Sequence, residues 1–131
     1  MKNLKYLLLI IVILSLSKDK QCFAQNFTPE EQHKIDSLNA IITNPNSPDT
    51  SLARAYVSLS EILSLSYLDT VIPLCTKAKN IAEKALKNKV TIREKHSLKT
   101  NLSASFYNIG FIYKYHGEIV KALEYYHKSL K

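Results

Sequence analysis

Hydrophobic residues recur every three or four positions along most of the chain after residue 27, and this spacing is typical of amphipathic α-helices. The apolar stripes run over residues 35–42, 52–63, 71–85, 98–113 and 122–130. No segment shows a convincing alternation of apolar and polar residues, which would indicate a strand. We therefore predict five helices in series and an all-α fold.

Local signals predict where these helices begin and end. Thr28-Pro29-Glu30-Glu31 has the pattern of a capping box, in which the hydroxyl and the carboxylate satisfy each other's free amides. The run Asn44–Asp49 is rich in Pro and Asn and predicts the first boundary. Pro73 follows Asp69 closely, so we expect it in the first turn of a helix, where a missing N–H is tolerated. Residues 25–48 then form an N-terminal helix and linker, and residues 49–131 a helical domain.

One motif stands out in the last third of the chain. Phe106-x2-Ile109-Gly110-x2-Tyr113 is followed by Ala122-x3-Tyr126, and these spacings match the tetratricopeptide pattern W-x2-L-G-x2-Y…A-x3-F. The segment of about 103–131 therefore resembles a tetratricopeptide repeat (TPR). The resemblance implies antiparallel helix pairs stacked as a short right-handed solenoid. The predicted repeat-packing residues are Phe106, Ile109, Gly110, Tyr113, Ala122 and Tyr126.

The physical roles of these residues agree with the motif. Gly110 and Ala122 are small where two antiparallel helices must approach closely, and Gly117 permits the turn between them. We expect Gly110 and Ala122 to lie at the tightest helix contact.

A degenerate copy of the motif lies upstream, over about residues 52–87. Tyr56-x2-Leu59-Ser60-x2-Leu63 corresponds to the first helix, with Ser60 in place of glycine, and Val71-x3-Cys75-x2-Ala78 corresponds to the second. The two copies are farther apart than the roughly 34 residues of a standard repeat. We expect elongated helices, one reaching toward Lys87 and one starting near Val90.

Elongated repeats of this kind resemble the exported N-terminal TPR region of bacterial signalling or transcriptional regulators. This resemblance implies that the chain is the outer-facing part of a larger regulator. Residue 131 falls inside the second helix of the better repeat, so we expect the repeat array to be truncated.

The first 24 residues have the pattern of a secretory signal. Lys2 and Lys5 precede the apolar run 6–16, and Cys22-Phe23-Ala24 offers small residues at the positions that signal peptidase reads. The apolar run is shorter than the roughly 20 residues that cross a bilayer. We expect cleavage after Ala24 and location in the periplasm or cell envelope, with retention of the segment as an anchor as the alternative. No permanent membrane span is expected in residues 25–131.

Composition and charge narrow the function further. The 131 residues are enough for one domain, and two Gly and four Pro are too few for a fold of strands and tight turns. The net charge of +7 falls to a mild excess once the signal is removed, and the basic residues are dispersed. Nucleic-acid binding is therefore not expected in this segment.

Candidate chemistry is sparse, and we predict neither an enzyme nor a bound cofactor or metal. Cys75 lies in an apolar stripe and is expected to act as a small hydrophobe rather than a catalytic thiol. Glu124-x2-His127 has the spacing of a di-iron ligand pair, but the second such pair is missing, so a solvated helix face is the better interpretation. The remaining mature histidines, His33, His96 and His116, are expected at the surface.

Because neither an enzyme nor a cofactor site is predicted, we expect the protein to act through a binding surface. By position in the TPR pattern, the residues that would line a peptide groove are Ala104, Tyr107, Phe111, Lys114 and Tyr115. Their rings would supply contact area and Lys114 an anchor for a carboxylate. In the alternative interpretation, Phe111 and Tyr115 pack against a neighbouring repeat.

The last helix should also leave Leu123, Tyr126 and Leu130 uncovered, which permits self-association through that C-terminal face. The sequence thus predicts a protein-protein interaction scaffold with a protein or peptide partner. The alternative is a free-standing exported helical protein that is structural or self-associating and has no enzymatic activity.

Overall fold

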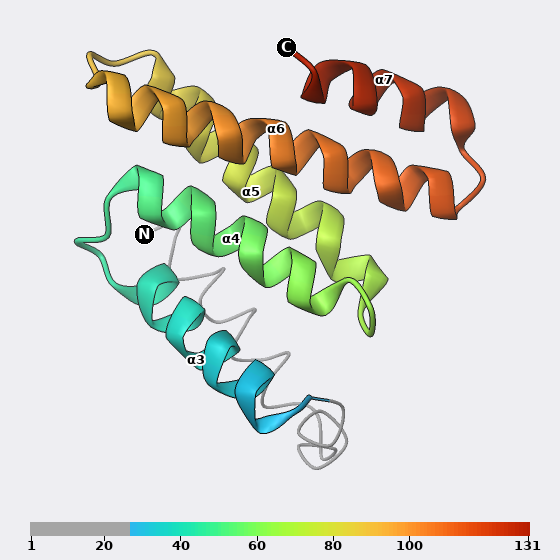
Figure 1. Cartoon of the computed structure of the whole chain (residues 1–131), viewed down its shortest axis with the longest axis horizontal. Helices are drawn as coiled ribbons and strands as arrows, with labels where there is room; N and C mark the ends of the chain where they lie inside the picture. The colour runs from blue at the N-terminus through green and yellow to red at the C-terminus, as the bar shows by residue number, and fades with distance from the viewer. Residues whose placement is uncertain (1–26) are drawn as a thin grey trace, which may run out of the picture. The chain divides into compact units, whose positions relative to one another are not determined.

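A computed structural model describes residues 27–131, which contain five α-helices and no strand (Figure 1). The helices are α3 (Pro29–Thr43), α4 (Asp49–Leu63), α5 (Leu68–Leu86), α6 (Ile92–Tyr115) and α7 (Ile119–Ser129). The prediction of an all-α fold is confirmed, while the finer prediction of a right-handed solenoid stays a prediction. The signal-peptide prediction for residues 1–24 lies outside the described residues.

The chain divides into two compact units, residues 1–33 and 34–131, and α3 crosses this division. In the first unit, the Thr28 amide donates to Glu31 Oε2 at 2.8 Å, and the Glu31 amide donates to Thr28 Oγ1 at 3.2 Å. These two bonds form the predicted capping box at the start of α3.

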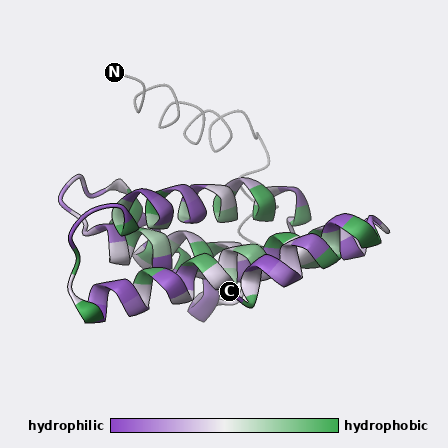
Figure 2. Ribbon diagram, turned by 90° about the horizontal axis from the view of Figure 1, so that it is seen from above, coloured by the Kyte–Doolittle hydropathy of each residue, from purple (hydrophilic) through white to green (hydrophobic). Residues whose placement is uncertain are grey.

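In the second unit, α4 to α7 pack as chain neighbours that run in opposite directions (Figure 1). Helix α4 also packs directly against α6. We call α4 with α5 the upstream pair and α6 with α7 the downstream pair. Each described helix carries both hydrophobic and hydrophilic residues, so burial of one face drives the packing (Figure 2).

Two clusters of buried side chains form the core of this unit. Around Leu98, the cluster contains alanines from α4 and α5: Ala53, Ala82 and Ala85. The other cluster joins α5 to α6 and consists of Val71, Cys75, Ile109 and Ile112. Small residues predominate in the first cluster and larger ones in the second. Leu98 lies in the first half of α6 and Ile112 near its end, so the two clusters together hold α6 along most of its length.

Helix α6 is 24 residues long and has well-defined ends. Thr91 and Glu94 form a second capping box at its start. At its end Gly117 adopts φ +78°, and the Glu118 amide donates to the Tyr113 carbonyl at 2.9 Å. This is a Schellman motif, and it explains why a glycine stands at the predicted turn.

The predicted position of Pro73 is wrong. Helix α5 begins at Leu68, and Pro73 lies inside it rather than in its first turn. Without an N–H, Pro73 cannot donate to the carbonyl of Asp69. Both residues are exposed, and water can solvate a carbonyl at that position.

The stripe predicted for α4 also differs from the observed one. Ala55 and Leu59 are buried as expected, but Ala53, Val57 and Ser60 are buried too. Helix α4 packs against both α5 and α6, so its buried surface is wider than a single stripe. None of the helices in residues 27–131 has the length and apolar character needed to cross a membrane.

Candidate functional site

Helices α6 and α7 of the downstream pair approach closely at Gly110. A Cβ built on Gly110 would lie 2.9 Å from Cδ1 of Tyr126 and 3.2 Å from the Ala122 carbonyl oxygen. Ala122 is the one buried residue of α7. A side chain at position 110 would therefore push the two helices apart, and the glycine permits their close approach.

The upstream pair makes a contact at the matching positions. In the repeat register, Ser60 corresponds to Gly110 and Cys75 to Tyr126. The Cys75 thiol donates to Ser60 Oγ at 3.2 Å, and both residues are fully buried. A small residue against a tyrosine in one pair is thus replaced by two residues of moderate size in the other.

Ser60 is the centre of a small buried polar cluster. Its hydroxyl donates to the Val57 carbonyl at 2.6 Å and accepts from Cys75 and from Asn108 Nδ2, the latter at 3.5 Å. The hydroxyl thus uses its donor and both acceptor sites. Burial raises the pKa of the Cys75 thiol, so the sulfur stays protonated, in a setting unlike that of a catalytic thiolate. The cluster was not predicted, although Ser60 and Asn108 are polar residues inside apolar stripes.

The other predicted packing residues lie at the two junctions that α6 makes with α5 and with α7. Ile109 is buried in the cluster that joins α5 to α6. The Tyr125 ring lies 5.4 Å from that of Tyr113 and 6.2 Å from that of Phe106, measured between centroids. The sequence prediction did not include Tyr125. In the repeat register, Tyr125 corresponds to Leu74 of the upstream pair, just as Tyr126 corresponds to Cys75.

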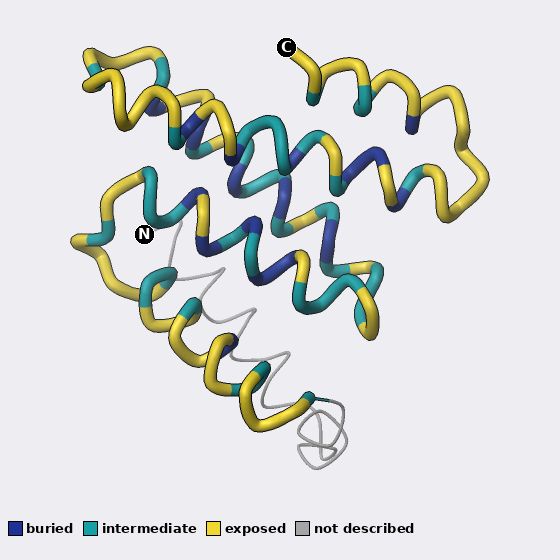
Figure 3. Tube along the Cα trace, in the orientation of Figure 1, coloured by how far each residue is buried: buried dark blue, intermediate teal, exposed yellow. Residues whose placement is uncertain are grey.

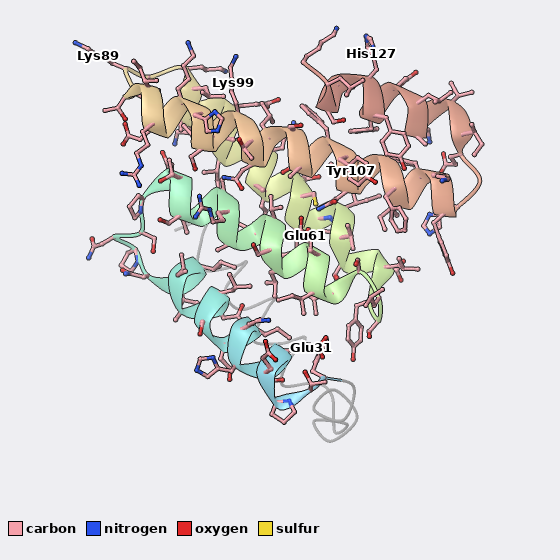
Figure 4. The ribbon with its side chains drawn as sticks, in the orientation of Figure 1. Glu31, Glu61, Lys89, Lys99, Tyr107 and His127 are labelled. Carbon is pink, nitrogen blue, oxygen red and sulfur yellow. The ribbon has the colours of Figure 1, made fainter. Side chains whose placement is uncertain are left out.

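The residues predicted to line a groove lie on α6 with different exposures. Tyr107 is 56% exposed, and Phe111 and Tyr115 are exposed as well. These three lie four residues apart and so share one side of the helix. Lys114 is exposed, whereas Ala104 is half-buried. Figure 4 shows the Tyr107 side chain on α6.

A second exposed apolar stripe follows α7. Ile119, Leu123 and Leu130 are exposed, with Leu123 at 61% and Leu130 at 84%. Tyr126 lies on the same side but is half-buried, because its ring packs on Gly110 and lies 5.4 Å from the Tyr107 ring. Figure 3 shows most of α7 as exposed.

The two stripes meet where Tyr107 contacts Tyr126, and together they form one apolar surface. We call it the α6–α7 face. Its residues are Tyr107, Phe111, Tyr115, Ile119, Leu123 and Leu130. An exposed apolar surface that spans two helices is typical of an interaction site rather than of ordinary solvent-facing helices.

The corresponding surface of the upstream pair is covered. In the repeat register, Leu68 corresponds to Ile119 and Ile72 to Leu123. Leu68 and Ile72 are half-buried and pack against the cluster of Val71, Cys75, Ile109 and Ile112, which joins α5 to α6. Val57, the counterpart of Tyr107, is buried. The surface that α6 covers in one pair is therefore exposed in the next.

The histidines singled out in the sequence, and the Glu124–His127 pair, are exposed in the part of the chain that the structure describes. The three histidines are His33, His96 and His116. Within residues 27–131 no three His, Cys, Asp or Glu side chains are arranged to hold a metal ion.

Comparison of the chain with protein-family models, curated proteins and solved structures gives no match. The functional interpretation therefore rests on the packing and exposure of the side chains described above.

Proposed function

We propose that this chain is a protein-interaction module of the tetratricopeptide type and that a partner helix docks on its α6–α7 face. The observation that carries the proposal is the difference between two matching surfaces. Leu68 and Ile72 of the upstream pair are half-buried against the cluster that joins α5 to α6, whereas their counterparts Ile119 and Leu123 are exposed. A helix that packs there as α6 packs on the upstream pair would complete the pattern.

Two features support the repeat interpretation. The contact of Ser60 with Cys75 and the contact of Gly110 with Tyr126 fall at matching positions of the two pairs. In addition, α6 packs against both helices of the upstream pair, as a stacked repeat would.

The chemistry of the face indicates the kind of partner. Its aromatic and aliphatic side chains would take an apolar helix stripe, with the rings supplying most of the contact area. Lys121 and Lys128 are already engaged, because their ammonium groups lie over the Tyr113 and Tyr125 rings. Lys114 is exposed beside Phe111 and Tyr115. We expect an amphipathic partner helix with an acidic residue placed to meet Lys114.

We further propose that this module lies outside the cytoplasm as part of a larger signalling or transcriptional regulator. The export pattern of residues 1–24 and the elongated repeats support this proposal. A second candidate function is self-association. It is favoured by the same face, because an apolar surface on one copy can pair with itself about a two-fold axis.

Site-specific photo-crosslinking in cells that produce the protein would test docking. A photoreactive phenylalanine analogue at Tyr107 or Leu123 is expected to give a discrete crosslinked product, because both side chains lie on the α6–α7 face. The same analogue at Lys99, toward the start of α6 (Figure 4), should give none. The identity of the product by mass spectrometry separates a second copy of this chain from another protein.

Leu123→Glu in the Tyr107-labelled chain supplies the specificity control, because a carboxylate in the centre of the face should abolish the product. Absence of any product at positions 107 and 123 would contradict the proposal. So would equal crosslinking at position 99.

A further inference from the structure

A cavity of about 380 Å³ lies within the second unit, bounded by α3, α4 and the first turns of α6. This volume is within the range of pockets that bind small molecules. Leu38, Ile41 and Ala55 supply its apolar wall. Hydroxyl groups supply much of the remaining lining, from Thr50, Ser51, Ser58 and Ser97.

Both arginines of the chain line this cavity. Arg54 comes from α4 and Arg93 from the first turn of α6, so two exposed arginines that are far apart in sequence line one cavity. Within residues 27–131, neither guanidinium takes part in an ion pair or a hydrogen bond. The guanidinium group suits carboxylate and phosphate, so two arginines without an acidic partner favour an anionic ligand.

Glu94 is the one acidic residue in the cavity lining. Its Oε2 accepts hydrogen bonds from the Thr91 amide at 2.8 Å and the Thr91 hydroxyl at 2.7 Å. These bonds hold the pKa of Glu94 below its ordinary value and turn the carboxylate toward the helix cap. The lining therefore carries a net positive charge, and the Glu94 carboxylate is already hydrogen-bonded to Thr91 at the cap of its own helix.

We propose that this cavity binds an amphiphilic organic anion, with a carboxylate or phosphate headgroup held by Arg54 and Arg93. The headgroup accepts hydrogen bonds from the two guanidinium groups and from hydroxyls such as Thr50 and Ser97. The apolar body of the ligand lies against Leu38, Ile41 and Ala55. This site is separate from the α6–α7 face, so it can be present whether or not a partner helix docks there.

Titration of the full chain followed by amide NMR shifts tests this site residue by residue. Octanoate and octyl phosphate serve as anionic probes, and 1-octanol serves as the neutral probe of matching chain length. We expect saturable shifts over residues 50–58 and 92–97 with the anions and much smaller ones with octanol. Octanol shifts equal to those of the anions, or the absence of any shift in these segments at millimolar concentrations, would overturn the proposal.

Variants separate this site from non-specific binding of an amphiphile. Arg54→Gln and Arg93→Gln should each weaken octanoate binding about tenfold, the effect of removing one charge-assisted contact. Lys99→Gln, on α6 but outside the lining, should leave it unchanged. Ser58→Leu keeps both arginines but fills the cavity, so it should also remove binding. Equal weakening by Lys99→Gln, or no effect of the two arginine variants and Ser58→Leu, would contradict the site.

A short peptide distinguishes the source of the anion. If the natural ligand is a peptide C-terminus, acetyl-Leu-Leu as the free acid should shift the same amide signals and its C-terminal amide should not. Failure of the free acid together with binding of octanoate would assign the site to a small-molecule anion. Equal binding of acid and amide would overturn the role of the arginines.

Discussion

Leu98→Ala should destabilise the second unit by about 2–5 kcal/mol, the usual cost of truncating a fully buried leucine. Leu98 is 1% exposed, and its closest buried neighbours are Ala53, Ala82 and Ala85. Alanines cannot extend to fill the space that the isobutyl group would leave, so the cavity should persist. Chemical denaturation followed by circular dichroism measures the change.

Leu65→Ala is the matched control, because Leu65 is 89% exposed and its loss should change stability by less than about 0.5 kcal/mol. The comparison of Leu98→Ala with Leu65→Ala also tests whether the extended parts of α5 and α6 pack against each other. If Leu98→Ala cost as little as Leu65→Ala, the extended parts of α5 and α6 would not be packed as described.

Ala122→Leu should destabilise the downstream pair by about 1–3 kcal/mol through overpacking. Ala122 is buried, and its carbonyl lies within reach of a Cβ at Gly110. A leucine there must displace the Tyr126 ring or separate α6 from α7. Thermal unfolding of the two proteins measures this cost.

Glu124→Leu adds the same side chain at an exposed position of the same helix and should have little effect on the melting temperature. A stable Ala122→Leu variant would show that α6 and α7 do not approach through Gly110 and Ala122.

The order and extent of the helices could be predicted from the sequence because their signals are local. Apolar spacing, the Thr28–Glu31 capping box and Gly117 each depend on a few adjacent residues. Thr91-x2-Glu94 carries the same capping signal and sets the start of α6. It could have been identified from the sequence, which would have placed that helix start at Ile92 rather than near Val90.

The tertiary environment of single residues was harder to predict. Ala53 and Val57 fall outside the stripe expected for α4, and they are buried because that helix packs against both α5 and α6. The hydrogen bonds of Ser60 join three helices, and Arg54 and Arg93 share a cavity although they are far apart in sequence. Such groupings depend on how the helices cross, which periodicity does not encode.

The exposed apolar surface was predicted on α6 but not in its full extent. The TPR register selected Tyr107, Phe111 and Tyr115, and all three are exposed. The stripe on α7 extends the surface to Ile119, which was not among the predicted residues. A register can be predicted from spacing, but the way in which two stripes join depends on the contact of Tyr107 with Tyr126.

The central claim is that the α6–α7 face is the uncovered counterpart of a surface that α6 covers in the upstream pair. Carbene footprinting of the dilute chain tests it most directly, because Leu123 and Ile72 are matching positions with similar side chains. We predict several-fold stronger labelling of Leu123 and Ile119 than of Ile72 and Leu68 in the same sample. Equal labelling at the matching positions, or stronger labelling of Ile72 and Leu68, would contradict the account.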